Sequence, residues 1–299
     1  NGLFVMPDGI WSLREQVTSV PVTVQSALEN LADRVGITPS EISAAGASQA
    51  LRGFKVTGAT GARGAIEALF KAFPVIGFES QEVLKFTTLG TSSIVTIPEG
   101  DLLEIKDGKT RTKMIRTRAQ ELDLPRQVDF GFADVNQDYQ PDWQYSSIID
   151  TISQEKQRIS VPVVFNSAEG AQRADQIKRQ LWTERLGFQI ALGPKYTYLD
   201  PGDVITLPTA QGNVAARIIK IRRGVSMEHR IDLLAELNQN YTSDAVGNDP
   251  ASDNAQALSS PGPTKLSFID TVPLRAQDTG PGYYLAVSGY TSAWVGSNV

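Results

Sequence analysis

The chain has 299 residues, of which 41% are hydrophobic, 20% charged and 8% aromatic, a composition typical of globular proteins. At about 100–150 residues per domain, this length indicates two or three domains. The 28 basic and 33 acidic side chains leave a net charge of −5, which argues against a basic groove for nucleic acid but not against DNA that passes nearby. The absence of cysteine excludes a disulfide scaffold and thiolate chemistry, and no apolar run reaches the ~20 residues of a transmembrane helix.

The two ends of the sequence indicate a segment of a longer polypeptide. The first residue is Asn1 rather than methionine, and no signal-peptide pattern follows it. The last residues come directly after an aromatic, strand-like run from Tyr283 to Trp294. We therefore expect the chain to stop a few residues into a further domain.

The first 110 residues alternate helical and strand-like patterns. Apolar residues spaced three and four apart predict helices, and short apolar runs between turn residues predict strands. We expect residues 1–110 to form a small α+β domain whose helices lie against one face of a sheet. The predicted helices are 24–35, 40–45 and 62–73, and the predicted strands are 53–56, 75–78, 83–87 and an apolar stretch at 94–97.

From residue 111 to residue 237 strands predominate, and several alternate polar and apolar residues as half-buried antiparallel strands do. One helix interrupts them over residues 167–186, with Ser167 as its N-cap and Gly187 at its end. Asp200-Pro201-Gly202-Asp203 is a tight-turn signature. We expect a tube-like β-barrel or sandwich with one packed helix. Its predicted strands are 127–132, 145–152, 159–165, 188–192, 203–207, 215–222 and 227–237.

The apolar stripe of the predicted helix indicates which side it buries. We expect Ile177, Leu181 and Trp182 to face a sheet. The expected contacts are the strands around Phe188, Ile190, Val204 and Ile218.

Residues 238–263 are rich in Asn, Asp, Ser, Ala and Pro and carry few bulky apolar side chains. Such a composition buries too little surface to offset chain entropy, so we predict a flexible linker. Residues 264–299 then begin a further β domain. The expected fold class is α+β with mainly antiparallel strands.

No motif for catalysis or metal binding is complete. Gly58, Gly61 and Gly64 lack the GxGxxG spacing of a dinucleotide loop, and a tight turn explains them better. Residues 134–138 imitate a calcium loop without its glycine and its bidentate glutamate. The single histidine, His229, cannot form a histidine-based metal cluster, and we expect it to be structural or at an interface.

The charged clusters do not reveal an active site either. Sequence spacing cannot establish the two facing carboxyls that a glycosidase needs. One basic run is expected to be a solvated face or a protected strand edge, with a rim for an acidic partner as the alternative. We predict no catalytic residue, cofactor or metal. The carboxylates are Glu99, Asp101 and Glu104, and Asp134, Asp138 and Asp142; the basic residues are Lys106, Lys109, Arg111, Lys113, Arg116 and Arg118.

The order of motifs along the chain resembles a known family. Residues 168–182 read AEGAQRADQIKRQLW, and a strand and the sequence YLDPGDVI follow at 198–205. Earlier, LRGF at 51–54 precedes AIEAL at 65–69. This pattern is similar to the phage tail proteins of siphophage baseplate hubs and of gene transfer agents. The resemblance covers about residues 50–299 and is strongest at 160–207.

The resemblance implies a structural role in a virion rather than an enzyme. Its members are similar to tail tip hubs that form a three-fold ring at the distal end of the tail tube and open for DNA ejection after host attachment. It implies a homotrimer, made in the bacterial host cytoplasm, that meets the distal tail protein, the tape-measure protein and tail fibre or tip proteins. Contact with phage DNA would be transient, and contact with the host envelope indirect. The candidate structural or interface residues are Leu181, Trp182, Pro201, Gly202, Asp203 and Trp294.

Two other functions stay open. A tail-associated cell-wall or polysaccharide hydrolase would use two of the carboxylates named above. A carbohydrate-binding module would present Trp143, Tyr139 and Tyr145 as a stacking platform.

Overall fold

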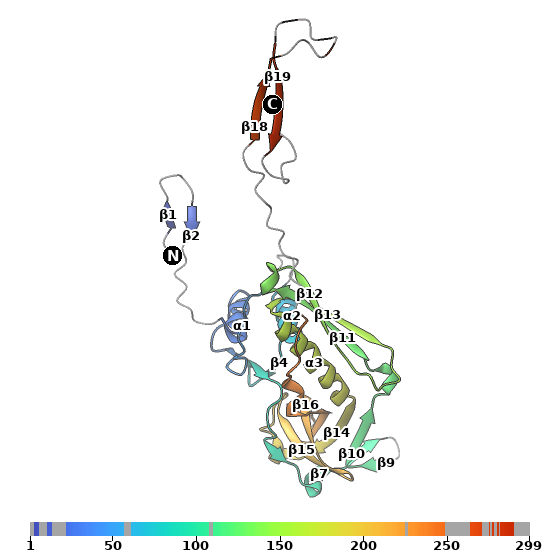
Figure 1. The fold of residues 1–299 in the computed structure, drawn as a ribbon. Helices are drawn as coiled ribbons and strands as arrows, with labels where there is room; N and C mark the ends of the chain where they lie inside the picture. Colours follow the sequence, from blue (N-terminus) through green and yellow to red (C-terminus); the bar gives the residue numbers. More distant parts are fainter. Residues whose placement is uncertain are drawn as a thin grey trace. The chain divides into compact units, whose positions relative to one another are not determined.

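The computed structural model describes residues 3–5, 11–13, 22–56, 61–107, 110–224, 227–248, 264–270, 275, 277, 280 and 282–289. The chain divides into two compact units, Asn1–Asn248 and Asp249–Val299. A short hairpin of β1 (Leu3–Val5) and β2 (Trp11–Leu13) belongs to the first unit. The described residues form three α-helices and mostly antiparallel sheets, which confirms the α+β class (Figure 1).

The N-terminal helices form where the apolar spacing predicts them. Thr23 begins α1 (Val24–Asp33) with a capping box to Ser26, and α2 (Ala62–Ala72) ends at Phe73, before Pro74. The predicted hairpin is β4 (Val75–Ser80) and β5 (Val83–Thr88).

Two predictions in this region were wrong. Residues 40–45 are not helical, because Ile42–Ser43 (β3) pairs in parallel with β5 and six residues are too few to stabilise a helix alone. Residues 53–56 make only an isolated bridge, Phe54 to Val163, instead of a strand.

A three-stranded sheet follows, in the order β12-β11-β13. Strand β11 pairs with β12 in antiparallel and with β13 in parallel orientation. The helix α3 (Ser167–Glu184) covers one side of this sheet, as Figure 1 shows. The strands are β11 (Gln127–Asp134), β12 (Pro141–Ser147) and β13 (Lys156–Phe165).

A seven-stranded sheet has the order β10-β14-β17-β16-β15-β6, with β7 paired to β14. The two ends of this order, β10 and β6, do not pair in the described chain, so the sheet is open, and of the two expected forms, barrel or sandwich, the described strands are consistent with the sandwich. The strands are β6 (Val95–Thr96), β7 (Leu102–Leu103), β10 (Met114–Arg118), β14 (Leu186–Leu192), β15 (Val204–Thr209), β16 (Gly212–Arg223) and β17 (His229–Ala235); β8 (Ile105–Asp107) and β9 (Thr110–Thr112) form a separate hairpin.

The buried side chains form two hydrophobic cores. The first core joins α1, α2 and the sheet of β3, β4 and β5 to the three-stranded sheet and α3, with Phe73 5.4 Å from Phe165 between ring centroids. The second core lies within the seven-stranded sheet. We expected a domain boundary at residue 110, but neither core is confined to one side of it. Strands after residue 110 supply apolar side chains to both the first and the second core.

The position of α3 corrects two expectations. Asn166, not Ser167, is the N-cap, and it forms a capping box with Glu169. Ile177 and Leu181 pack in the first core rather than against the strands of the second. The physical reason is that α3 follows β13 directly and folds back on the sheet that contains β13.

Residues 238–248, expected to begin a flexible linker, instead lie along α3 and include a short helix, η5 (Asn238–Tyr241). The rest of the expected linker, residues 249–263, lies outside the described residues. In the second unit, β18 (Thr264–Ile269) and β19 (Tyr284–Gly289) form an antiparallel hairpin. None of the described helices has the length and hydrophobicity to cross a membrane.

Candidate functional site: the polar face of α3

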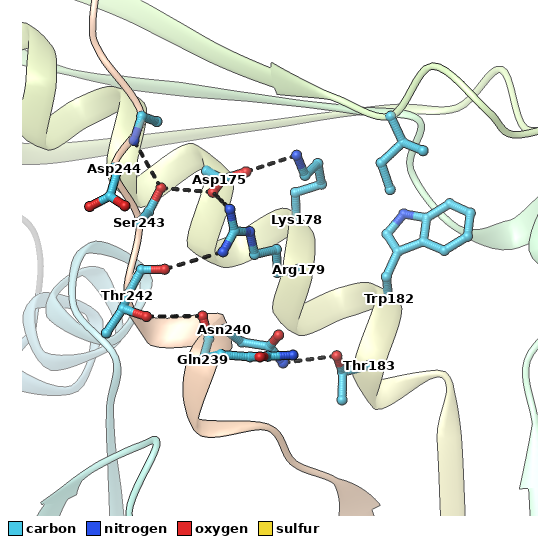
Figure 2. Close-up of a pocket in the computed structure, with 12 residues that line it drawn as sticks. Asp175, Lys178, Arg179, Trp182, Thr183, Gln239, Asn240, Thr242, Ser243 and Asp244 are labelled. Carbon is cyan, nitrogen blue, oxygen red and sulfur yellow. Dashed lines mark hydrogen bonds and ion pairs between the residues drawn. The ribbon is translucent and has the colours of Figure 1, made fainter.

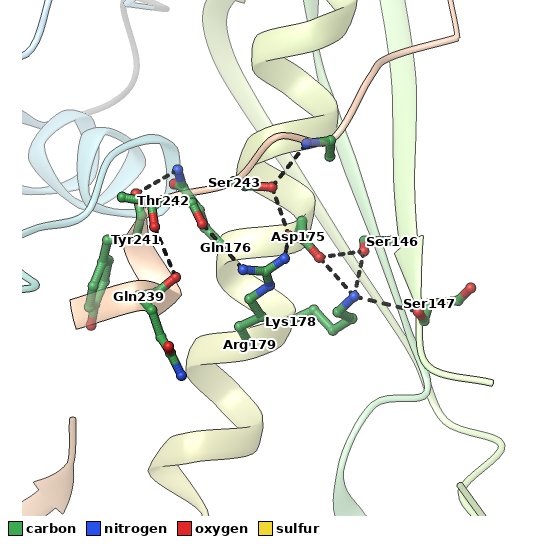
Figure 3. A network of polar contacts seen from close by, with 11 residues as sticks. Ser146, Ser147, Asp175, Gln176, Lys178, Arg179, Gln239, Tyr241, Thr242 and Ser243 are labelled. Carbon is green, nitrogen blue, oxygen red and sulfur yellow. Dashed lines mark hydrogen bonds and ion pairs between the residues drawn. The ribbon is translucent and has the colours of Figure 1, made fainter. Parts of the chain in front are cut away.

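A buried carboxylate, Asp175, is the centre of a polar network on α3 (Figure 3). It forms ion pairs of 2.8 Å with Lys178 and with Arg179, which follow it by three and four residues and therefore lie on the same face of the helix. It also accepts hydrogen bonds from the hydroxyls of Ser146 (3.1 Å) and Ser243 (2.7 Å). Burial opposes the charge of Asp175, but the hydrogen bonds and the two cations outweigh it and hold its pKa below the usual range.

We call residues 238–248 the strap. Side chains of α3 form hydrogen bonds with the backbone of the strap and hold it against the helix. Gln176 donates to the carbonyl of Tyr241 (3.0 Å) and Arg179 to that of Thr242 (3.3 Å). Figure 2 shows the strap beside the helix, with Asn240 donating to the Thr183 hydroxyl (2.8 Å). The strap is therefore a fixed part of the first unit.

The strap ends in a second set of contacts. The Gln144 side chain donates to the carbonyl of Asn248 (2.9 Å) and accepts from its amide (3.1 Å). One residue earlier, Gly247 lies directly on the first turn of α3, where a Cβ would come within 2.1 Å of the Ser167 carbonyl oxygen. These contacts hold the chain at the point where it leaves the first unit.

A cavity of about 790 Å³ lies between α3 and the strap. Its wall includes Asp175, Lys178, Arg179, Trp182 and Ser243 (Figure 2). Lys178 also donates to the Ser146 hydroxyl at 2.8 Å. The charged groups Asp175, Lys178 and Arg179 of the wall are thus paired with one another. This arrangement is better suited to holding segments of the chain together than to transferring protons.

A buried ionic cluster joins α3 to the seven-stranded sheet. Arg217 on β16 donates to Glu184, at the end of α3, and to Glu236, which follows β17, at 3.0 Å. Glu236 also accepts from the amide of Gly90 at 3.0 Å. Burial raises the pKa of Glu184, and the nearby charge of Glu236 raises it further, against the effect of Arg217. The cluster therefore links the segments of the two cores.

The predicted tight turn at residues 200–203 is confirmed. Gly202 has φ +94°, and the amide of Asp200 donates to the Asp203 carboxylate at 2.9 Å. The Asp200 carboxylate in turn binds Ser80 (2.8 Å) and Lys85 (3.0 Å), which belong to β4 and β5. The turn, which includes Pro201, is therefore a second contact between the seven-stranded sheet and the first core.

Comparison of the sequence with known protein families identifies one match. The family profile described as "Putative phage tail protein" matches residues 61–223, which is more than half of the chain. The chain belongs to this phage tail protein family. No curated protein matches it by sequence.

Two solved structures share the fold of this tail protein. A chain of the virion of a native gene transfer agent particle is similar with a TM-score of 0.71 and 19% identity, over 79% of this chain and 53% of that one. A tail protein from Neisseria meningitidis MC58 is similar with a TM-score of 0.51 and 11% identity, over 73% and 67%. The tail protein described here thus spans about half the length of the gene transfer agent chain.

The other candidate residues have structural surroundings. The Trp182 indole donates to the Pro125 carbonyl at 2.9 Å, and the Arg185 guanidinium lies 5.5 Å from its ring centroid. Leu181 is half-buried at the edge of the first core. Trp294 lies outside the described residues.

Where the structure describes them, the motifs considered for catalysis or metal binding lie in the following surroundings. The described residues contain no group of three or more potential metal ligands, and residues 57–60 of the glycine-rich turn are outside them. Asp134 is buried and accepts from the amide of Asn136 (2.8 Å), as a turn residue does. His229 is buried, and its Nε2 lies 3.1 Å from the Thr197 hydroxyl oxygen. It lies on the buried face of β17, as the alternation of polar and apolar residues predicted.

The charged clusters are mostly paired. Asp101 accepts from Tyr196 (2.6 Å) and Lys195 (2.9 Å), which hold its pKa below the usual range. In the basic run, Arg111 pairs with Glu104 at 3.5 Å and Arg116 donates to Gln211 at 2.6 Å. Lys106 and Lys109 have no described side-chain surroundings.

Several residues of the site were missed by sequence reasoning. Asp175 could have been found, because Lys178 and Arg179 follow at i+3 and i+4. Arg173 is also buried, where it donates to the Lys71 carbonyl of α2 (3.3 Å), and burial lowers its pKa to about 10. Gln144 and Gly247 carry no local signal, since their partners are distant in sequence.

Proposed function

We propose that this tail protein is a segment of the hub at the distal end of the tail, that it works as a homotrimer, and that it has no active site of its own. In this role it closes the tail tube and opens for DNA ejection into the host. The observation that carries the proposal is the family match over residues 61–223, together with the fold shared with a chain of a gene transfer agent virion.

The internal organisation suits a part that must stay rigid within a particle. The Arg217 cluster and the turn at residues 200–203 join the two cores, and the strap joins α3 to β12. A buried ion pair is costly to break, because removal of one partner leaves an unpaired charge. A body held together by this buried cluster, by the turn at residues 200–203 and by the strap keeps its shape when neighbours bind or move.

The proposed partners follow from this position. They are two further copies of the chain, the distal tail protein, the tape-measure protein and tail fibre or tip proteins, with transient contact to DNA and indirect contact with the host envelope. The net charge of −5 suits a conduit for DNA, because attraction would slow the transit of a polyanion.

Immunogold labelling of purified particles tests the position. Antibodies are raised against the full chain, and label confined to the distal tail end is the expected result. Label along the tail shaft or on the capsid would overturn the hub assignment. Sedimentation velocity of the purified full chain, alone and with the distal tail protein, measures its oligomeric state, and a trimer is the expected result. A chain that stays monomeric in the presence of the distal tail protein would contradict the proposal.

A further inference from the structure

Two aromatic side chains, Trp143 and Tyr145, occupy alternate positions on β12 and therefore point to the same side of the three-stranded sheet. They are 47% and 60% exposed. Their strand partners on that side are Gly131 and Asp129 of β11. The apolar residues of the first core lie on the opposite side, where α3 covers the sheet (Figure 1).

The Trp143 indole rests on the backbone of Gly131. A Cβ placed at residue 131 would be 2.9 Å from each of three carbons of its six-membered ring. Three equal distances mean that the ring lies flat over this position. One face of the indole is therefore packed on the sheet, while the exposure of the side chain leaves surface for contact with solvent.

Polar groups surround this ring. The Arg158 guanidinium on β13 lies 6.0 Å from the ring centroid and donates through Nε to Asp129 at 3.1 Å. The Asp129 carboxylate also accepts from the Gln127 amide at 2.5 Å. The two terminal nitrogens of Arg158 make no hydrogen bond to the described part of the chain, so N–H donors remain available near the ring.

We propose that this face of the sheet, formed by Trp143, Tyr145 and Arg158, is a binding site for a neutral polysaccharide. The flat indole and the Tyr145 ring would stack on the apolar C–H faces of sugar rings. The free N–H groups of Arg158 would donate to sugar hydroxyls. The two aromatic residues are about 7 Å apart along the strand, so both can contact one glycan chain.

The surroundings of the rings favour a glycan over a protein partner. The centre of a protein interface is usually a contiguous apolar patch. Here, the residues that share this side of the sheet with the two rings are largely polar, namely Gln127, Asp129, Arg158 and Ser160. Separate flat rings among hydrogen-bonding groups match a sugar chain, which alternates apolar faces with hydroxyls.

Affinity electrophoresis of the full chain tests the site. Native gels containing soluble β-glucan, mannan or galactan are compared with gels without polysaccharide. The wild-type chain is expected to be retarded by at least one of the three. Trp143→Ala should raise the apparent Kd about tenfold or more, Trp143→Phe should retain part of the affinity, and Arg158→Ala should weaken it.

Tyr198→Ala is the matched control, because Tyr198 is 59% exposed but lies outside the three-stranded sheet. It should bind as the wild type does. The proposal is overturned if no polysaccharide retards the wild-type chain, or if Trp143→Ala and Tyr198→Ala behave alike. A Trp143→Ala variant that loses self-association and no glycan affinity would assign the face to a protein partner instead. The proposal does not depend on the hub assignment.

Discussion

Gly247 lies against the carbonyl group of Ser167, with no room for a side chain between the strap and the first turn of α3. The Gln144 side chain binds both backbone groups of the next residue, Asn248. Only glycine fits at this position, because the Cβ of any other residue would overlap the backbone of the helix. The strap is therefore part of the folded first unit up to its last described residue.

Substitution of Gly247 should displace the strap. A Cβ at this position would come within 2.1 Å of the Ser167 oxygen, and neither backbone can move freely. We expect Gly247→Ala to lower the free energy of unfolding by about 1–3 kcal/mol in urea denaturation. Gly193→Ala is the control, since Gly193 has open space around its Cβ position and φ −79°. Equal stability of the two variants would mean that the strap does not pack as described.

The charge of Asp175 should make the strap contacts sensitive to acid. Its pKa is lowered in the folded chain, so its contribution to stability is present above the unfolded pKa of about 3.9 and is lost as the pH falls through the lower folded value. Asp175→Asn should therefore be less stable than the wild type at neutral pH, with a difference that narrows below about pH 4. Urea denaturation across this range measures it, and a difference that stays constant with pH would contradict the role of the charge.

Removal of Arg217 should leave buried carboxylates without a cation. The Glu236 side chain is 1% exposed, so Arg217→Met should cost about 3–5 kcal/mol of unfolding free energy. The double variant Arg217→Met with Glu236→Gln should recover part of this loss, because one of the two uncompensated charges is then removed while Glu184 remains. Arg222→Met removes a half-exposed ion pair with Asp232 and should change stability by less than about 1 kcal/mol. Similar losses for Arg217→Met and Arg222→Met would disprove the importance of the buried cluster.

The turn at Gly202 should tolerate no side chain. Its φ of +94° disfavours other residues, and a Cβ would come within 2.8 Å of the Ile76 side chain. We expect Gly202→Ala to lower the thermal midpoint, with a free-energy loss of about 1–3 kcal/mol. Adding Ile76→Val should relieve the steric part but not the backbone strain. Gly100→Ala, at a position with open space, serves as the control and should leave the midpoint nearly unchanged.

The elements that the sequence determined by itself are those whose signals are local. Apolar spacing located α1, α2 and α3, alternation placed His229 on the buried face of β17, and Asp200-Pro201-Gly202-Asp203 specified a turn. These features depend on residues within a few positions of one another, where helix geometry, strand pleat and φ preferences act directly.

Only the tertiary structure decided which surfaces meet. The stripe containing Ile177 and Leu181 identified a buried side of α3 but not the core that receives it. The polar composition of residues 238–248 suggested a linker, yet side chains of α3 and β12 satisfy the backbone of this segment and fix it in place. Arg217 is buried on β16 because Glu184 and Glu236, which are distant from it in the sequence, pair with its charge. Such contacts depend on the sum of burial, pairing and close approach between distant residues, which no local pattern contains.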